Sequence, residues 1–353
     1  MKRYSWVKRA LLLGFFVLLA ACAGDAGPAG PAGPTGPAGP QGPAGPEGQA
    51  GVAADLDVSD LSCTECHNDT TLIWSKEAQF RERSVHGTGE AFERGGSTNC
   101  AGCHGHEGAK ARISAGLPPH DPSVEGVTNV SPYDCRTCHQ IHTTYTGADF
   151  ALTGDAQPVV LEMTGGTFDS GAGNLCSNCH QIRNELPVAT GGVVEFETTR
   201  FGTHHGVEAP MLLGEGGLLG VTGSPSPHYT ATEDGCVTCH MGEERNHTYE
   251  PELVNCQGCH ADLDTFDRNG VQTEIQGLLD EVKALLISSG IMSADYEEDG
   301  VLEQNRSIAG AYPEEVAGAM WNYMFVLEDQ SHGVHNPGFA RALLEAARDA
   351  LQG

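Results

Sequence analysis

Hydrophobic residues recur with a helical period in only one part of this chain, the C-terminal third. Apolar side chains spaced three and four residues apart predict an amphipathic helix that ends near Gly290. Pro313, with two acidic residues after it, opens a second helix, and Asn336 followed by Pro337 is typical of the N-cap and first turn of a third. The three helices are expected to form a bundle. The positions that carry the first helix are Ile275, Leu278, Leu279, Val282, Leu285 and Leu286.

The long middle region shows no comparable period. The chain has 47 glycines and only 6% aromatic residues, so this region offers few large apolar side chains for an ordinary core. We therefore expect short helices joined by long loops, with loops such as residues 214–220 wrapped over some other apolar group. The predicted fold class is mainly α and irregular, with the C-terminal helical bundle as its regular part.

The apolar group is indicated by a motif that occurs six times, Cys-x-x-Cys-His, and that uses twelve of the thirteen cysteines. Two thiols one helical turn apart can each form a thioether with a haem vinyl group while the adjacent imidazole binds the iron. The spacing is therefore typical of c-type haem attachment. Disulfides or zinc knuckles would explain the cysteines but not the histidine that follows every pair. The sequence thus predicts six haems c and a haem-cored multihaem cytochrome.

The motifs, numbered first to sixth in chain order, assign two sets of residues. The thioether cysteines are Cys63, Cys66, Cys100, Cys103, Cys135, Cys138, Cys176, Cys179, Cys236, Cys239, Cys256 and Cys259. The proximal iron ligands are His67, His104, His139, His180, His240 and His260. The fifth and sixth motifs begin only 20 residues apart, so their haems are expected to be near neighbours.

The ligand on the second face of each iron decides between electron transfer and substrate chemistry. Ten histidines remain outside the motifs, more than the six required, which favours two histidines on every iron. His332 and His335 are alternatives to the main candidates, whereas His106 lies too close to its own motif. A methionine could also serve at one site. The candidate distal ligands, with one of the adjacent pair at 204 and 205 completing the six, are His86, His120, His142, His204, His205, His228 and His247.

The N-terminus has the features of an export signal. Residues 1–21 carry four basic residues, an apolar run and a small-residue end. The run is far shorter than the roughly 20 residues that cross a bilayer, which disfavours a transmembrane anchor. Leu19-Ala20-Ala21-Cys22 resembles the lipobox of bacterial lipoproteins, so Cys22 is the expected lipidation site. Ala23, and not an acidic residue, stands directly after Cys22, which permits the outer membrane, and a soluble secreted form stays open as the alternative.

A strict Gly-X-Y repeat follows the lipidation site, with glycine at every third position from Gly24 to Gly51 and proline at X in seven consecutive triplets. Only glycine fits the axis of a collagen triple helix, so the period is the collagen signature. Proline never occupies the Y position. A semi-rigid stalk and a collagen-like homotrimer therefore both stay open, and either would hold the haem body away from the membrane.

The chain is strongly acidic, with a formal net charge of −28 at pH 7. This charge excludes nucleic acid as a partner bound through bulk charge, and it also serves solubility. The expected organisation is a lipoprotein signal peptide over 1–21, a lipidated collagen-like stalk over 22–54, a hexahaem region over 55–265, and C-terminal helices packed on it over 266–353.

These features resemble outer-surface multihaem c-type cytochromes of metal-respiring bacteria. The resemblance rests on the six motifs, on the Cys-x-x-Cys-His-x-x-His run that ends at His142, on Thr-His-His-Gly at 203–206, and on the segment that ends in Asn336-Pro337. The C-terminal signature, which includes Trp321-Asn-Tyr, is similar to that of the ammonia-forming nitrite reductase and octahaem superfamily. No Cys-x-x-Cys-Lys motif is present, so the lysine-ligated catalytic haem of that superfamily has no counterpart here.

The resemblance implies an electron carrier at the cell surface, active in extracellular respiration and without catalytic residues. Its expected partners are other redox proteins, mineral or other extracellular acceptors, the outer membrane through the lipid anchor, and further copies of the chain in a trimer or filament. A reductase of a small nitrogen or sulfur compound, with one open haem face, is the alternative. A mainly structural fibre is the third reading.

Overall fold

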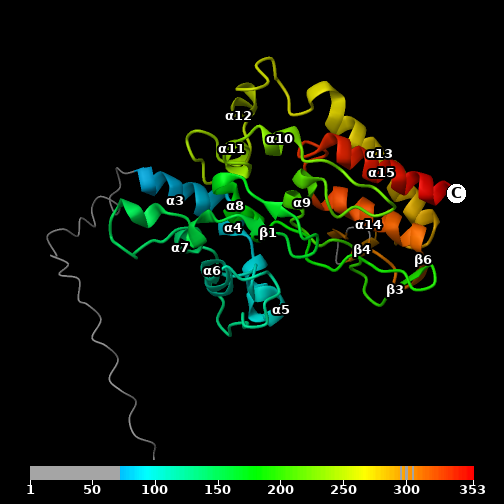
Figure 1. Cartoon of the computed structure of the whole chain (residues 1–353), viewed down its shortest axis with the longest axis horizontal. Coiled ribbons are helices and arrows are strands. Elements are labelled where there is room, and N and C mark those ends of the chain that lie inside the picture. The colour runs from blue at the N-terminus through cyan, green and yellow to red at the C-terminus, as the bar shows by residue number, and fades with distance from the viewer. Residues whose placement is uncertain (1–71, 295, 299–300, 304–305) are drawn as a thin grey trace, which may run out of the picture. The chain divides into compact units, whose positions relative to one another are not determined.

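The computed structural model describes residues 72–294, 296–298, 301–303 and 306–353 (Figure 1). The chain divides into two units, Met1–Asp55 and Leu56–Gly353, and the whole first unit lies outside the described residues. The signal, Cys22, the Gly-X-Y repeat and the first motif, residues 63–67, also lie outside them. What the sequence predicts for those segments stays a prediction.

The described chain is mainly helical and irregular, which confirms the predicted fold class. The helices before the C-terminal third are α3 (Leu72–Arg83), α4 (Val85–Thr88), α5 (Thr98–Ala101), α6 (His106–Ala115), α7 (Cys135–Cys138), α8 (Asn174–Ser177), α9 (Glu208–Leu213), α10 (Pro227–Thr230), α11 (Cys236–His240) and α12 (Leu253–Gln257). The 3₁₀ turns are η2 (Ala91–Gly96), η3 (Gly147–Phe150), η4 (Thr153–Ala156), η5 (Gly171–Gly173) and η6 (Arg268–Gly270).

The strands of the described residues form three two-stranded antiparallel sheets. They pair β1 (Val159–Val160) with β2 (Thr167–Phe168), β3 (Val193–Phe196) with β6 (Gly310–Pro313), and β4 (Tyr296–Glu298) with β5 (Val301–Glu303). The pairing of β3 with β6 joins the middle of the chain to the segment that leads into the C-terminal helices.

Three longer helices form the C-terminal part, α13 (Val271–Ser288), α14 (Glu314–Glu328) and α15 (Pro337–Gln352). The Asn336 side chain accepts a hydrogen bond from the Phe339 N–H, as the predicted N-cap requires. Gly290 has a left-handed φ of 77° just beyond the end of α13, a conformation that glycine adopts without strain. All three predicted helices are confirmed.

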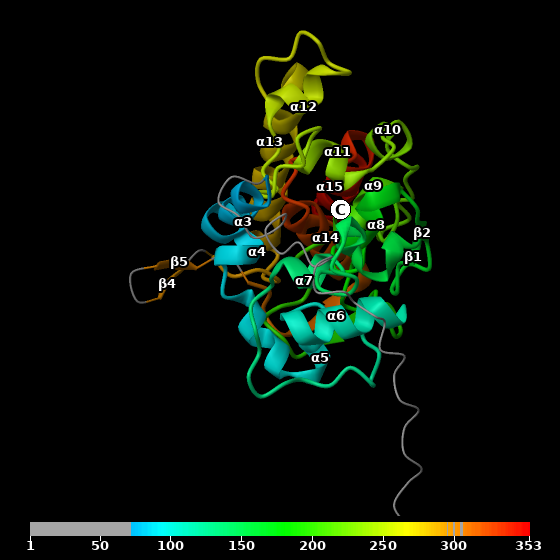
Figure 2. The ribbon, with the colours of Figure 1, turned by 90° about the vertical axis from the view of Figure 1, so that its left-hand side faces the viewer.

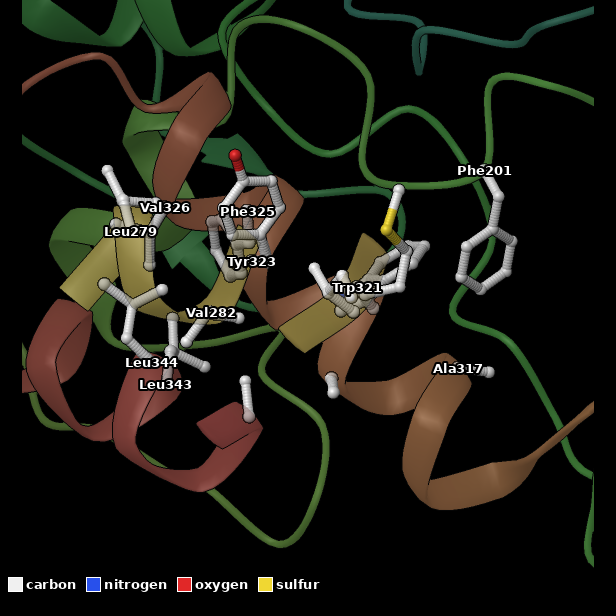
Figure 3. Packing of buried hydrophobic residues seen from close by; sticks show 14 of the residues in the cluster. Phe201, Leu279, Val282, Ala317, Trp321, Tyr323, Phe325, Val326, Leu343 and Leu344 are labelled. Carbon is white, nitrogen blue, oxygen red and sulfur yellow. The ribbon is translucent and has the colours of Figure 1, made fainter. Parts of the chain in front are cut away.

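The hydrophobic core lies between these helices. Figure 3 shows side chains of α13, α14 and α15 pointing toward one another, with Phe201 from a loop at one end. The fully buried members include Ile275, Val282 and Leu286 of α13, Trp321 and Phe325 of α14, and Leu343 and Leu344 of α15. None of the helices in the described ranges is long and apolar enough to cross a membrane.

The loop at residues 214–220 corrects one expectation. We expected it over the haems, but it packs on α14 and α15. The Trp321 indole N–H donates to the Gly216 carbonyl at 2.9 Å, and the Asn322 amide binds both backbone groups of Leu218. A side chain at position 217 would clash with Leu343, so glycine there permits this close approach. The loop has no hydrophobic period, and its glycines gave no sign of which surface it covers.

The region before residue 266 is built differently. Figure 2 shows α5, α6 and α7 as a group of short helices close to one another. A second, small hydrophobic cluster lies around β1, β2 and α9, and its buried members are Leu161, Phe168, Ala209, Leu212 and Leu213.

Candidate haem sites

Five of the six motifs lie in the described chain, and each of the five coincides with a short helical turn. Backbone hydrogen bonds from the motif histidine to the first cysteine close the turn, for example from His104 N–H to the Cys100 carbonyl at 2.9 Å. The turn of the third motif is fixed by a capping box. The Asp134 carboxylate accepts a hydrogen bond from the Arg136 N–H, and the Thr137 hydroxyl oxygen accepts one from the Asp134 N–H. The motif sequence thus sets a local geometry that places both thiols and the imidazole on one turn.

The ten cysteines of these five motifs are all free thiols. In the residues that the structure describes, no group of three or more His, Cys, Asp or Glu side chains could hold a metal ion directly. Motifs two to six are therefore not arranged as zinc knuckles or disulfide pairs.

Each of the five motif histidines faces a histidine from outside the motifs. The pairs, with their ring-centroid distances, are His104 with His204 at 6.3 Å, His139 with His247 at 6.2 Å, His180 with His86 at 6.0 Å, His240 with His335 at 6.2 Å, and His260 with His228 at 6.1 Å.

These distances match two imidazoles on opposite faces of one metal ion. An imidazole nitrogen binds a metal at about 2 Å, and the ring centroid lies about 1 Å behind that nitrogen. Two such rings across one iron therefore have centroids about 6 Å apart. A cysteine pair, an adjacent imidazole and an opposing imidazole at this distance fit haem c at each of the five sites.

The hydrogen bonds of the imidazoles leave one ring nitrogen for a metal. Backbone carbonyls accept from Nδ1 of His139, His228, His240 and His247 at 2.6–2.9 Å. A proton held on Nδ1 leaves the Nε2 lone pair available, which is the arrangement common in metal-binding histidines. Burial also lowers the pKa of His204 to about 4, so this imidazole stays in the neutral form that binds metals.

At two histidines, a carboxylate rather than a backbone carbonyl is the hydrogen-bond partner of Nδ1. His180 Nδ1 lies 2.9 Å from Glu208, and His335 Nδ1 lies 2.7 Å from Asp329. The charge of Glu208 raises the pKa of His180 to about 10. Burial acts against the charged form of His335, but Asp329 and, after it, Glu208 raise its pKa overall. Glu208 therefore acts on ligands of two sites, the fourth and the fifth.

The adjacent histidines 204 and 205 face different partners. His204 has a left-handed φ of 69° and faces His104, whereas the His205 imidazole lies against the buried carboxylate of Glu328. The sequence left open which of the two is a ligand. The structure brings only His204 to a motif histidine within the described residues.

Two other candidates lie elsewhere. His120 Nδ1 lies 2.8 Å from Glu162, and the ring of His142 stacks on Tyr145 at 5.4 Å. No described motif histidine lies against either of them. Conversely, His335, only an alternative at the level of sequence, faces His240. Its signal was its position just before the last helix, but nothing in the sequence showed that this segment returns to the fifth motif.

The three methionine candidates were Met163, Met211 and Met241. The first two pack in the hydrophobic cluster of the C-terminal helices, where Met211 is fully buried. All five described motif histidines have a histidine opposite them, so none of the five sites requires a methionine ligand.

The attachment turns contact one another out of chain order. The Cys103 thiol interacts with that of Cys179, which raises the pKa of Cys103 and lowers that of Cys179 to about 5. The Cys176 thiol interacts in the same way with Cys236, and the pKa of Cys236 rises. The fourth motif therefore touches both the second and the fifth.

Weaker electrostatic effects place the other two described motifs. Burial and, after it, the thiols of the fourth motif raise the pKa of Cys138 to about 12. Burial and, after it, the thiols of the sixth motif raise the pKa of Cys239. The third motif is thus a neighbour of the fourth, and the sixth a neighbour of the fifth, in line with their short separation in sequence.

Comparison with known proteins agrees with this geometry. Residues 52–140 match the family of cytochrome c7 and related cytochrome c, a segment that contains the first three motifs. The crystal structure of the outer cell wall cytochrome OcwA is similar over 78% of this chain and 50% of that one, with 22% identity and a TM-score of 0.50. This chain has the fold of a multihaem cytochrome.

A second multihaem cytochrome is similar at a lower level. The undecahaem cytochrome from the S-layer of Carboxydothermus ferrireducens is 20% identical over 81% of this chain and 41% of that one, with a TM-score of 0.44. No curated protein matches the chain. The chain spans half the length of OcwA and less than half of the second structure. Haem c is the cofactor that the family match over residues 52–140 implies.

Proposed function

We propose that this cytochrome is an electron carrier that holds six haems c and passes electrons along them at the cell surface. The observation that supports it most strongly is the set of five histidine pairs about 6 Å apart, each beside a pair of free thiols. When bound, haem c supplies reversible one-electron chemistry at iron. Two imidazoles on each iron would leave no face open for a substrate, which favours transfer over catalysis.

The proposed ligand sets follow the pairs. The proximal histidine of each described motif is its fifth-position residue, and the proposed distal ligands of motifs two to six are His204, His247, His86, His335 and His228. For the first motif, His67 is the proposed proximal ligand. Its distal partner stays open among the remaining histidines, and His142 in the Cys-x-x-Cys-His-x-x-His run is the candidate that the sequence favours.

The contacts between attachment turns support a branched route for electrons. The fourth site would form the junction, because its thiols interact directly with those of the second and fifth motifs and electrostatically with Cys138 of the third. The sixth site would extend the route beyond the fifth. The role of the protein along this route is to hold the attachment turns in contact and to keep the imidazoles in fixed orientation by their Nδ1 hydrogen bonds.

Location and partners rest on the N-terminal sequence. The signal over 1–21, lipidation at Cys22 and the stalk over 22–54 support an outer membrane lipoprotein with its haem region displayed outward. OcwA is, by its name, an outer cell wall cytochrome, which supports an extracellular location for this chain. Redox proteins and mineral or other extracellular acceptors are the proposed partners, and the stalk leaves a trimer or a filament open.

Mass and spin-state measurements test the proposal. The mass of the denatured full chain would show six covalent haems, and peptide mapping would place one on each motif. Low-temperature electron paramagnetic resonance of the oxidised protein would show low-spin iron only. A ligand-accessible high-spin iron would contradict the carrier and favour a reductase of a small nitrogen or sulfur compound.

A further inference from the structure

Arg112 is a fully buried charged residue in the middle of the haem-attachment region. It lies on α6 with 0% of its surface exposed. Its Nε donates to the Gly102 carbonyl at 2.6 Å, Nη1 donates to the Leu117 carbonyl at 3.1 Å, and Nη2 donates to the Asn178 carbonyl at 3.0 Å. Nη2 also lies 3.5 Å from the Cys179 sulfur.

The guanidinium has no carboxylate to neutralise it. Within the described ranges, no ion pair includes Arg112, whereas four partly buried histidines and Arg341 lie beside an acid. Burying an unpaired charge is unfavourable unless hydrogen bonds compensate for the lost water. Here the compensation comes from three carbonyls and a sulfur, so the positive charge itself persists inside the protein.

The partners of Arg112 come from two different motifs. Gly102 lies within the second motif, whereas Asn178 and Cys179 lie within the fourth. These are the two motifs whose thiols, Cys103 and Cys179, interact directly. One planar guanidinium therefore binds, in both attachment turns, the carbonyl just before the second cysteine, at the point where the turns meet.

Two glycines near Arg112, one in the second motif and one on α6, fit this arrangement. A Cβ at position 102 would lie 2.5 Å from the Pro119 carbonyl oxygen and 3.1 Å from Cδ of Arg112. A Cβ at Gly108, one turn before Arg112, would lie 2.2 Å from the Ala101 carbonyl oxygen. Both glycines let α6 approach the attachment turn closely enough for the arginine to reach across it.

We propose that Arg112 is a positioning residue that fixes the contact between the attachment turns of the second and fourth motifs, and that its buried charge would raise the reduction potential of haems held there. The inference rests on the proposed function, because it requires haem at these two motifs. The rigid fork of arginine makes several hydrogen bonds in fixed directions, which a lysine cannot reproduce. A buried positive charge favours the reduced, less positive state of nearby iron.

The test uses the haem-loaded full chain with Arg112→Met and Arg112→Lys. Methionine removes both the guanidinium hydrogen bonds and the charge, whereas lysine removes the fixed geometry of those hydrogen bonds and keeps the charge. Arg83→Met is the matched control, since this arginine is 59% exposed in its side chain and pairs with an exposed acid. Three quantities are measured: haem content of each motif peptide, midpoint potentials, and amide hydrogen exchange in peptides covering 98–108 and 174–180.

We expect both Arg112 variants to exchange faster in these two peptides, while a peptide covering 256–260 stays as in the wild type. Arg112→Met is expected to shift two of the midpoint potentials downward, and Arg112→Lys to leave them closer to the wild type. If Arg112→Met fails to take up all its haems, the exchange of Arg112→Lys decides the positioning role, and the potentials of Arg112→Gln, which keeps a polar side chain without the charge, decide the effect of the charge.

Unchanged exchange in both peptides together with unchanged potentials would overturn the inference. So would the same shifts in Arg83→Met. If the wild-type peptides of the second or fourth motif carry no haem, the proposed function itself fails at that motif, and peptide mapping shows this separately from the potentials.

Discussion

The C-terminal helices and the haem-attachment region of this protein are stabilised in different ways. The helices α13, α14 and α15 bury their own apolar side chains against one another, with a core that includes Trp321 and Phe325. The part of the attachment region at residues 72–140 buries few large apolar side chains, and its order comes from capped turns, glycine contacts and hydrogen bonds to backbone carbonyls. The C-terminal helices therefore supply their own apolar interior, whereas the attachment region would depend on the apolar surface of its haems.

Producing the full chain without haem attachment would test this contrast most strongly. We expect amide protection to be lost over residues 72–140 and to persist in α13, α14 and α15, because the helices keep an apolar core of their own. Hydrogen exchange followed by mass spectrometry measures both regions in one sample. Equal protection, or equal loss, in the two regions would contradict the comparison.

Truncation in the bundle core should affect stability without affecting the haems. Phe325 has 0% of its surface exposed, and Phe325→Ala is expected to cost about 3–5 kcal/mol in the free energy of unfolding. Thermal and denaturant unfolding would measure the loss, and the oxidised haem spectrum should stay unchanged. Val188→Ala is the control, since this side chain is 85% exposed. A similar loss in the control would show that the bundle core is not the source.

A distal histidine from the C-terminal part connects the two regions. We expect His335→Ala to convert one of the low-spin irons to high spin, because the fifth site loses the imidazole opposite His240. It also removes one of the two hydrogen bonds of the buried Asp329 carboxylate, which keeps the bond from Ser331, at a cost of about 1–3 kcal/mol. Electron paramagnetic resonance counts the spin states. His332→Ala is the neighbouring control, and a high-spin signal in that variant instead would reassign the ligand.

The carboxylate beside His180 should tune potential without changing coordination. Glu208→Gln keeps an acceptor for Nδ1 but removes the negative charge, which stabilises oxidised iron through the imidazole. We expect a higher midpoint potential at the fourth site, a smaller rise at the fifth, and no change in spin state. Redox titration followed optically measures both. Glu250→Gln, at a 66% exposed side chain, is the control, and an unchanged or lower potential in Glu208→Gln would contradict the assignment.

The smallest effect concerns acid unfolding of the bundle. A hydrogen bond from Arg341 on α15 lowers the pKa of Glu274 on α13. The unfolded carboxyl binds its proton at a higher pH than the folded one, so this contribution is present above the unfolded pKa and is lost as the pH falls through the folded pKa. Glu274→Gln should therefore weaken the acid dependence of unfolding slightly. Glu281→Gln on the same helix is the control, and equal acid dependence in the wild type and Glu274→Gln would exclude a role for this pair.

Local features were predictable because their causes are local. The N-cap at Asn336, the end of α13 near Gly290 and the short turn at each described motif depend on neighbouring residues, and the sequence alone located them. Distal ligands were harder. A surplus of histidines indicated pairing, but loop residues in left-handed conformations, such as His204, have no periodicity from which their direction follows.

The sequence by itself determined the cofactor chemistry of this chain, because cysteine spacing and the adjacent histidine act within a single helical turn. It also determined the three C-terminal helices through their hydrophobic period. Only the tertiary structure decided which histidine faces which, that the fourth motif meets the second and the fifth, and that Arg112 joins two turns. Those relations are distances between segments far apart in the chain, and loop conformation and packing set them rather than any local pattern.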